Sequence, residues 1–179
     1  MKSTTIFITY NPNVASEHTL AVRLHSIGAV NGFRMYLPDR YNSDSILDAE
    51  TQRRINLADY MVFFSLGKLS NIVKQEIEYA FKHFQDKSKI IVIYNSVNGK
   101  NLKGEITHHF TSFQFNPVQD NQERLLQNIV NTIFQKQKTD NQNTQIRKIK
   151  EEQETQQGIS ALLGIGLGLF VLDALIDDK

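Results

Sequence analysis

Residues Tyr60 to Tyr94 read YMVFFSLGKLSNIVKQEIEYAFKHFQDKSKIIVIY, and the spacing of their apolar side chains decides the fold class. Two short runs rich in β-branched or aromatic residues, Tyr60–Phe64 and Lys89–Tyr94, predict buried strands. Between them, Ser70–Phe84 carries apolar residues three and four positions apart, which predicts an amphipathic helix. A strand, a helix and a second strand in this order are typical of a parallel sheet.

The same alternation continues on both sides of this unit. Further strands are predicted at Thr5–Tyr10, Phe33–Leu37 and Ser112–Phe115, and further helices at Ser16–Ile27, Ile46–Leu57 and Glu123–Phe134. Gly28 is expected to stop the first helix. The inward side chains of the last helix are expected to be Leu125, Leu126, Ile129, Ile133 and Phe134. We therefore predict an α/β, flavodoxin-like fold, with a five-stranded parallel sheet in the order 2-1-3-4-5 and helices on both faces.

Composition excludes several classes of protein. The chain has 179 residues, with 20 basic and 19 acidic side chains and a net charge of +1, so it offers no general attraction for nucleic acid. It contains no cysteine, which excludes disulfides and thiol catalysis. The N-terminal apolar run is too short for a signal peptide, and we expect a cytoplasmic protein.

The chain is predicted to consist of three parts. Residues 1–135 form the α/β domain, and residues 136–157, rich in glutamine and charge, form a polar linker or a solvated helix. Residues 158–179 form an apolar C-terminal helix, in which the stretch 158–176 has Asp173 as its only charge. That helix must meet another subunit, the domain itself or a membrane, and all three alternatives remain open.

Glu76 is the main candidate functional residue. On a helical projection it borders an apolar stripe composed of Val73, Ile77, Ala80, Phe81 and Phe84, whereas Gln75 and Glu78 point to the solvated side. A carboxylate among apolar neighbours has a shifted pKa and a fixed direction, which favours function. A boundary glutamate is also an ordinary helix residue whose stem covers apolar surface, so the pattern alone leaves both interpretations open.

Several polar residues follow the predicted strands and are expected to converge near Glu76. Ligands of such sheets bind beyond the carboxyl ends of the strands, where the strand order reverses. Each residue also has an ordinary role in packing, in a turn or as a helix cap. The candidates for substrate binding are Tyr10, Asn11, Asp39, Arg40, Ser65 and Ser70. The adjacent His108 and His109 have no partners at metal-ligand spacing, so no metal site is predicted.

Four motifs occur in an order and spacing that resemble those of a known family. They are IFITY at Ile6–Tyr10, LPDR at Leu37–Arg40, INLADYMVFFS at Ile55–Ser65, and a serine six residues before a glutamate at Ser70 and Glu76. In these features residues 1–135 resemble a Toll/interleukin-1 receptor (TIR) domain of the bacterial kind. The second motif lies where that family has its mobile BB loop.

The resemblance implies an activity and a site. Many TIR domains of this type hydrolyse or rearrange NAD, and Glu76 matches their catalytic glutamate, while Ile72 stands where the family usually has a tryptophan that contacts the nucleotide. NAD would be the substrate and no cofactor is implied. The product would be ADP-ribose or a cyclised or conjugated form of it, made in antiphage immunity of the Thoeris type and sensed by an effector protein. Family members often assemble into homo-oligomers.

Two other functions remain open at this point. The chain could be a non-enzymatic adaptor that assembles through its BB loop and C-terminal helix. It could also be an enzyme similar to the nucleoside deoxyribosyltransferases, which share the fold and a similarly placed glutamate.

Overall fold

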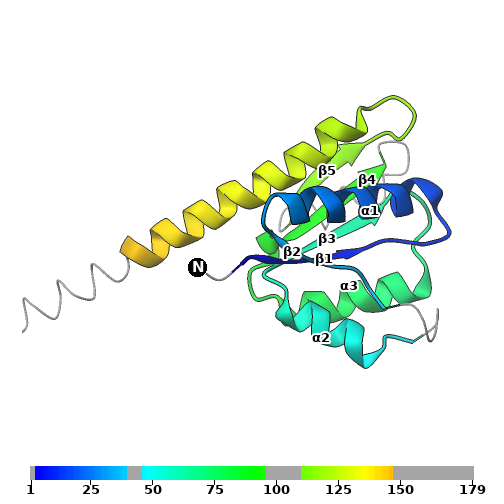
Figure 1. The fold of residues 1–179 in the computed structure, drawn as a ribbon. Helices are drawn as coiled ribbons and strands as arrows, with labels where there is room; N and C mark the ends of the chain where they lie inside the picture. Colours follow the sequence, from blue (N-terminus) through cyan, green and yellow to red (C-terminus); the bar gives the residue numbers. More distant parts are fainter. Residues whose placement is uncertain (1–2, 40–45, 96–109, 147–179) are drawn as a thin grey trace, which may run out of the picture. The chain divides into compact units, whose positions relative to one another are not determined.

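The computed structural model describes residues 3–39, 46–95 and 110–146. Its centre is a five-stranded sheet in the order β2-β1-β3-β4-β5, and every pair of neighbouring strands is parallel. The strands are β1 (Thr5–Thr9), β2 (Arg34–Tyr36), β3 (Tyr60–Ser65), β4 (Ile90–Asn95) and β5 (Thr111–Phe115). The predicted flavodoxin-like order is therefore confirmed (Figure 1).

Helices cover both faces of this sheet, as Figure 1 shows. The helix α1 (Ala15–Val30) lies on one face together with the first part of a helix over residues 122–146. On the other face lie α2 (Ala49–Leu57) and α3 (Asn71–His83), and a short 3-10 helix, η1 (Lys87–Lys89), precedes β4. The predicted start of α2 at Ile46 is three residues early, because the side chain of Asp48 caps the helix by accepting the Thr51 N–H at 2.8 Å.

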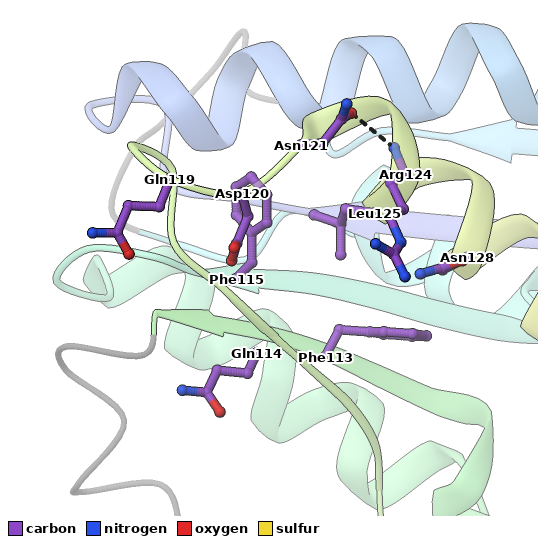
Figure 2. Close-up of a pocket in the computed structure, with 9 residues that line it drawn as sticks. All are labelled: Phe113, Gln114, Phe115, Gln119, Asp120, Asn121, Arg124, Leu125 and Asn128. Atoms are coloured by element: carbon purple, nitrogen blue, oxygen red, sulfur yellow. Dashed lines mark hydrogen bonds between the residues drawn. The ribbon is translucent and has the colours of Figure 1, made fainter.

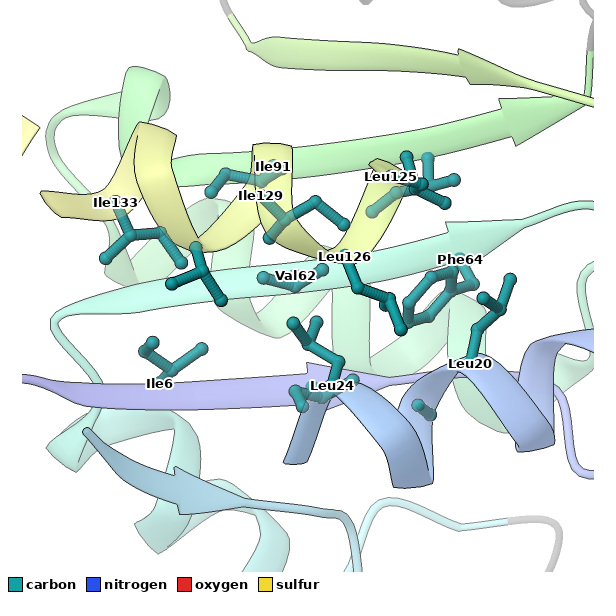
Figure 3. Close-up of a cluster of buried hydrophobic side chains, with 14 of the residues drawn as sticks. Ile6, Leu20, Leu24, Val62, Phe64, Ile91, Leu125, Leu126, Ile129 and Ile133 are labelled. Atoms are coloured by element: carbon teal, nitrogen blue, oxygen red, sulfur yellow. The ribbon is translucent and has the colours of Figure 1, made fainter. Parts of the chain in front are cut away.

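The strands separate two hydrophobic clusters because successive side chains point to opposite faces of a sheet. Ile6 and Ile8 of β1 join the cluster under α1, whereas Phe7 joins the cluster under α2 and α3. Figure 3 shows the first cluster, in which Leu20 and Leu24 of α1 pack beside residues of the helix 122–146. The central strands β1, β3 and β4 are apolar on both faces, as expected for a covered parallel sheet.

The prediction that Gly28 stops the first helix is wrong. Gly28 lies inside α1 and is buried, and a Cβ at this position would lie 2.5 Å from Met35 Sδ on β2. The residue that ends the helix is Gly32, at φ +84°, where the N–H of Phe33 reaches back to Gly28 O at 3.0 Å. Gly28 therefore serves the close packing of α1 on β2, and Gly32 supplies the left-handed turn.

Two aromatic side chains that were expected to face the core are exposed. Phe134 is 39% exposed, whereas Val130 and Ile133 of the same helix are buried. Phe81 is 46% exposed, and its ring packs against Phe110 with centroids 5.9 Å apart rather than against the sheet.

The chain divides into two compact units, Met1–Ile133 and Phe134–Lys179. In the second unit, residues 134–146 are helical and largely exposed. The predicted apolar helix over 158–179 lies outside the described residues. Within the ranges that the structure describes, no helix is long and apolar enough to cross a membrane.

Candidate active site

The candidate site lies at the carboxyl ends of β1 and β3, where the strand order reverses. The loops that follow these two strands contact each other directly, since the Asn11 side-chain amide donates to Lys68 O at 2.7 Å. A second contact comes from β4, where the Asn95 side chain donates to Leu66 O at 3.3 Å. The three loop ends thus form one polar edge of the sheet.

Glu76 lies at the centre of the buried face of α3 rather than at its border. Its side chain is 1% exposed, and the other buried residues of the helix are Ile72, Val73 and Ala80. The hydroxyl of Thr9, the last residue of β1, donates a hydrogen bond to Glu76 Oε2. This bond places the carboxylate at the carboxyl edge of the sheet, on the face covered by α2 and α3.

The first turn of α3 is fixed by Ser70. Its hydroxyl oxygen accepts the Val73 N–H at 3.4 Å, so Ser70 is the N-cap residue of α3. Ser65 is the buried last residue of β3 and lies five positions earlier. Ile72 is buried within α3, in the turn that precedes Glu76.

Asn11 and Tyr10 occupy different surroundings although they are adjacent. Asn11 is buried in the polar edge, where its side-chain oxygen also accepts the Asn13 N–H at 3.0 Å. Tyr10 is half-buried against the α1 cluster, and its ring lies 5.5 Å from that of His18. Asn11 is therefore part of the polar edge next to the loop after β3. Tyr10 packs against α1, as expected if its role is structural.

Asp39 is held by α2. Its backbone N–H donates to Thr51 Oγ1 at 3.0 Å, and its carboxylate lies 3.8 Å from the guanidinium of Arg54. Arg40, the next candidate, lies outside the described residues. The segment that leads into α2 also contacts α3, because Gln75 Oε1 accepts the Leu47 N–H at 3.2 Å, so Gln75 is half-buried rather than on the solvated side as predicted.

Sequence reasoning missed one buried acidic residue, Glu17 of α1. Its carboxylate is 0% exposed and accepts main-chain N–H groups from Asn11 at 2.7 Å, Leu66 at 2.7 Å and Gly67 at 3.0 Å. Burial raises the pKa of Glu17 above its ordinary 4.5, and the three N–H groups offset part of this effect. A signal was present, because Glu17 lies three and seven positions before Leu20 and Leu24 and thus on the apolar stripe of α1.

A separate hollow of about 460 Å³ lies between β5 and the start of the helix 122–146, as Figure 2 shows. Asn121 caps that helix by accepting the Arg124 N–H at 3.1 Å. None of the sequence-predicted site residues lines this hollow. Its lining consists of Phe113, Gln114, Phe115, Gln119, Asp120, Asn121, Arg124, Leu125 and Asn128.

No metal centre is found among the described residues, which hold no group of three or more potential ligands. The two histidines considered above, His108 and His109, lie outside them.

No model of a known protein family matches the chain, and no curated protein matches it either.

Proposed function

We propose that the protein cleaves the bond between nicotinamide and ribose in NAD, with Glu76 as the catalytic carboxylate. One observation supports this above all: Glu76 is a buried carboxylate held by Thr9 at the strand edge where ligands of this fold bind. The resemblance of the strand-end motifs to TIR domains supplies the substrate class. The proposal includes Asn11 and Ser65 as polar neighbours of the reacting ribose.

The chemistry requires only one carboxylate. Breaking the nicotinamide-ribose bond develops positive charge on the ribose, as in glycoside hydrolysis. The nicotinamide leaving group already carries a positive charge, so no general acid has to protonate it. Glu76 would stabilise the charge that develops on the ribose and accept a hydrogen bond from a ribose hydroxyl. Water or a second nucleophile would then attack the ribose carbon and release ADP-ribose, a cyclised form or a conjugate.

The burial of Glu76 has two consequences for this reaction. A carboxylate in an apolar, water-poor site stabilises a nearby positive charge far more strongly than it could in water. At 1% exposure, however, the carboxylate can reach the ribose only after the side chains above it have made room. Binding of NAD is therefore expected to open the polar edge, and the Thr9 hydroxyl would hold the carboxylate in place during that step.

The partners stay predictions. Assembly of several copies through the TIR-like domain and the segment 158–179 would raise the local concentration of one domain around another. A cytoplasmic site of action, membrane attachment through 158–176 and an effector protein that senses the product are likewise untested parts of this proposal.

The test is release of nicotinamide from NAD by wild type, Glu76→Gln and Glu78→Gln. Glu78 lies on the same helix two residues away and is exposed, so it is a matched control for charge and helix content. We expect Glu76→Gln to lose about 100-fold or more of the activity, as when a main electrostatic group is removed, and Glu78→Gln to retain it. Each variant is first shown to be folded by circular dichroism.

Four outcomes would reject the proposal. Equal loss in both variants, or full activity in Glu76→Gln, would remove Glu76 from the reaction. Cleavage of nucleosides without cleavage of NAD would indicate a transferase instead. No turnover by wild type under any condition that clusters the chains would indicate an adaptor.

A further inference from the structure

The second buried carboxylate, Glu17, joins two loops that are far apart in the sequence. Its Oε2 accepts the N–H of Asn11 in the loop after β1, and its Oε1 accepts those of Leu66 and Gly67 in the loop after β3. Hydrogen bonds from N–H groups to a charged carboxylate are stronger than those between neutral groups. One side chain of α1 therefore fixes the separation of the two strand ends.

Both of these loops lead directly to the Glu76 site. Asn11 is two residues beyond Thr9, whose hydroxyl donates to Glu76, and Gly67 is three residues before Ser70, which caps α3. The second loop also approaches the N-cap residue of α1 closely, since a Cβ on Gly67 would lie 2.8 Å from Val14 Cγ2. The path from Glu17 to Glu76 thus runs through two short, well-packed segments, one at each side of the site.

The charge of Glu17 costs the folded protein stability. Burial raises the pKa of this carboxyl, and the three N–H groups compensate for only part of that effect, so ionisation of Glu17 disfavours the folded state. A neutral side chain of the same shape would avoid this cost. Residues that lower stability in this way are typical of functional sites.

We propose that Glu17 is a positioning residue for Glu76, holding the loops after β1 and β3 so that Thr9 and the first turn of α3 keep the Glu76 carboxylate in its reactive place. This inference rests on the function proposed above. Glu17 itself is bonded to main-chain N–H groups and lies on the α1 side of the sheet, whereas Glu76 lies on the α3 side.

The first experiment compares wild type, Glu17→Gln and the control Glu78→Gln in NAD turnover and thermal unfolding at neutral pH. The amide of Gln places a donor against one of the N–H groups and loosens a loop while conserving volume. We expect kcat to fall about 10- to 100-fold with little change in KM, because misplacing a reacting group by about 1 Å has effects of that size. We also expect the melting temperature to change little, because the lost N–H bond lowers stability while removal of the buried charge raises it. A kcat within twofold of wild type, or a loss of kcat with an equally large loss of stability, would overturn the proposal.

A second experiment does not depend on turnover. In Glu17→Gln, hydrogen exchange is expected to quicken at the amides of Asn11, Leu66 and Gly67 and also at Val73, whose N–H is bonded to the Ser70 cap of α3. Unchanged exchange at Val73 would show that the effect stops at the loop, and would overturn the positioning role. If wild type cleaves no NAD, the proposed function fails, and this measurement alone decides whether Glu17 positions α3.

A third experiment tests whether an added anion restores NAD turnover when the Glu17 carboxylate is removed. Glu17→Ala leaves a small buried space lined by the three N–H donors, which formate can enter and fill as an anion. Recovery of NAD turnover on addition of formate to Glu17→Ala, with no effect of formate on Glu78→Gln, supports the role of the carboxylate. No recovery in Glu17→Ala, or a rise in turnover of the same size in Glu78→Gln, would contradict it.

Discussion

The two buried carboxylates lie on opposite faces of one sheet and are bonded to different kinds of donor. Glu17 on α1 is held by three main-chain N–H groups, which cannot turn away without moving a loop. Glu76 on α3 is bonded to the hydroxyl of Thr9, a side-chain group that can rotate. Burial alone therefore does not identify a reacting carboxylate, since both side chains are almost completely buried. Under the proposed function, Glu17 fixes two loops through main-chain bonds, whereas the bond from Thr9 to Glu76 comes from a hydroxyl that can rotate during a reaction.

The largest effect that would sharpen this comparison is expected at Thr9. Thr9→Val keeps the shape of the side chain but removes the hydroxyl that donates to Glu76. A hydrogen bond to a charged group contributes about 1.5–3 kcal/mol, so we expect NAD cleavage to fall about 10- to 100-fold. Kinetics of nicotinamide release check this. Thr9→Ser, which retains the hydroxyl, is the control and should keep most of the activity; equal loss in both would show that the hydroxyl has no role.

A smaller effect is expected at Gly67, in the loop that Glu17 holds. Gly67→Ala places a Cβ 2.8 Å from Val14 Cγ2, so either the loop or Val14 must move. We expect the free energy of unfolding in urea to fall by about 1 kcal/mol, the lower end of the cost of overpacking. The double variant Gly67→Ala with Val14→Ala should recover most of that loss. Failure to recover would mean that the contact does not limit this loop.

The smallest effect is a pH dependence of stability. The pKa of Glu17 is raised above 4.5 by burial, so the folded protein holds this proton more tightly than the unfolded chain does. As pH falls from neutral through the folded pKa toward 4.5, protonation of Glu17 therefore adds stability, and below 4.5 the gain is complete. The unfolding free energy of wild type minus that of Glu17→Gln should rise over this window in urea titrations. A constant or falling difference would mean that the buried charge of Glu17 is not costly.

The fold was predictable because strand and helix patterns rarely conflict in this chain. The runs at Tyr60–Phe64 and Lys89–Tyr94 became β3 and β4 with shifts of at most one residue at either end. The first helix was predicted to end at Gly28 because a glycine after an apolar stripe is a common stop. Its packing against Met35 is a long-range contact that no local pattern contains, although the pair Asn31 and Gly32 before an apolar residue was a usable signal for the actual end.

The site was only half predictable for a physical reason. Glu76 stood out because the helix pattern showed a charge among apolar residues, and the same reasoning applied to α1 would have singled out Glu17. The partners of Glu17 could not be predicted, because they are main-chain N–H groups, which every residue except proline has. The bond between Thr9 and Glu76 joins positions 67 residues apart. Predicting it would have required the position of α3 relative to the end of β1.

The position of Glu17 restricts where a nucleotide can place its phosphates. In doubly wound sheets, free main-chain N–H groups at the switch point form the usual cradle for phosphate oxygens. Here the amides of Asn11, Leu66 and Gly67 at the junction of β1 and β3 already surround an anion that belongs to the protein. A dinucleotide bound at this edge would therefore have to orient its pyrophosphate away from the junction and present its uncharged or cationic end to it.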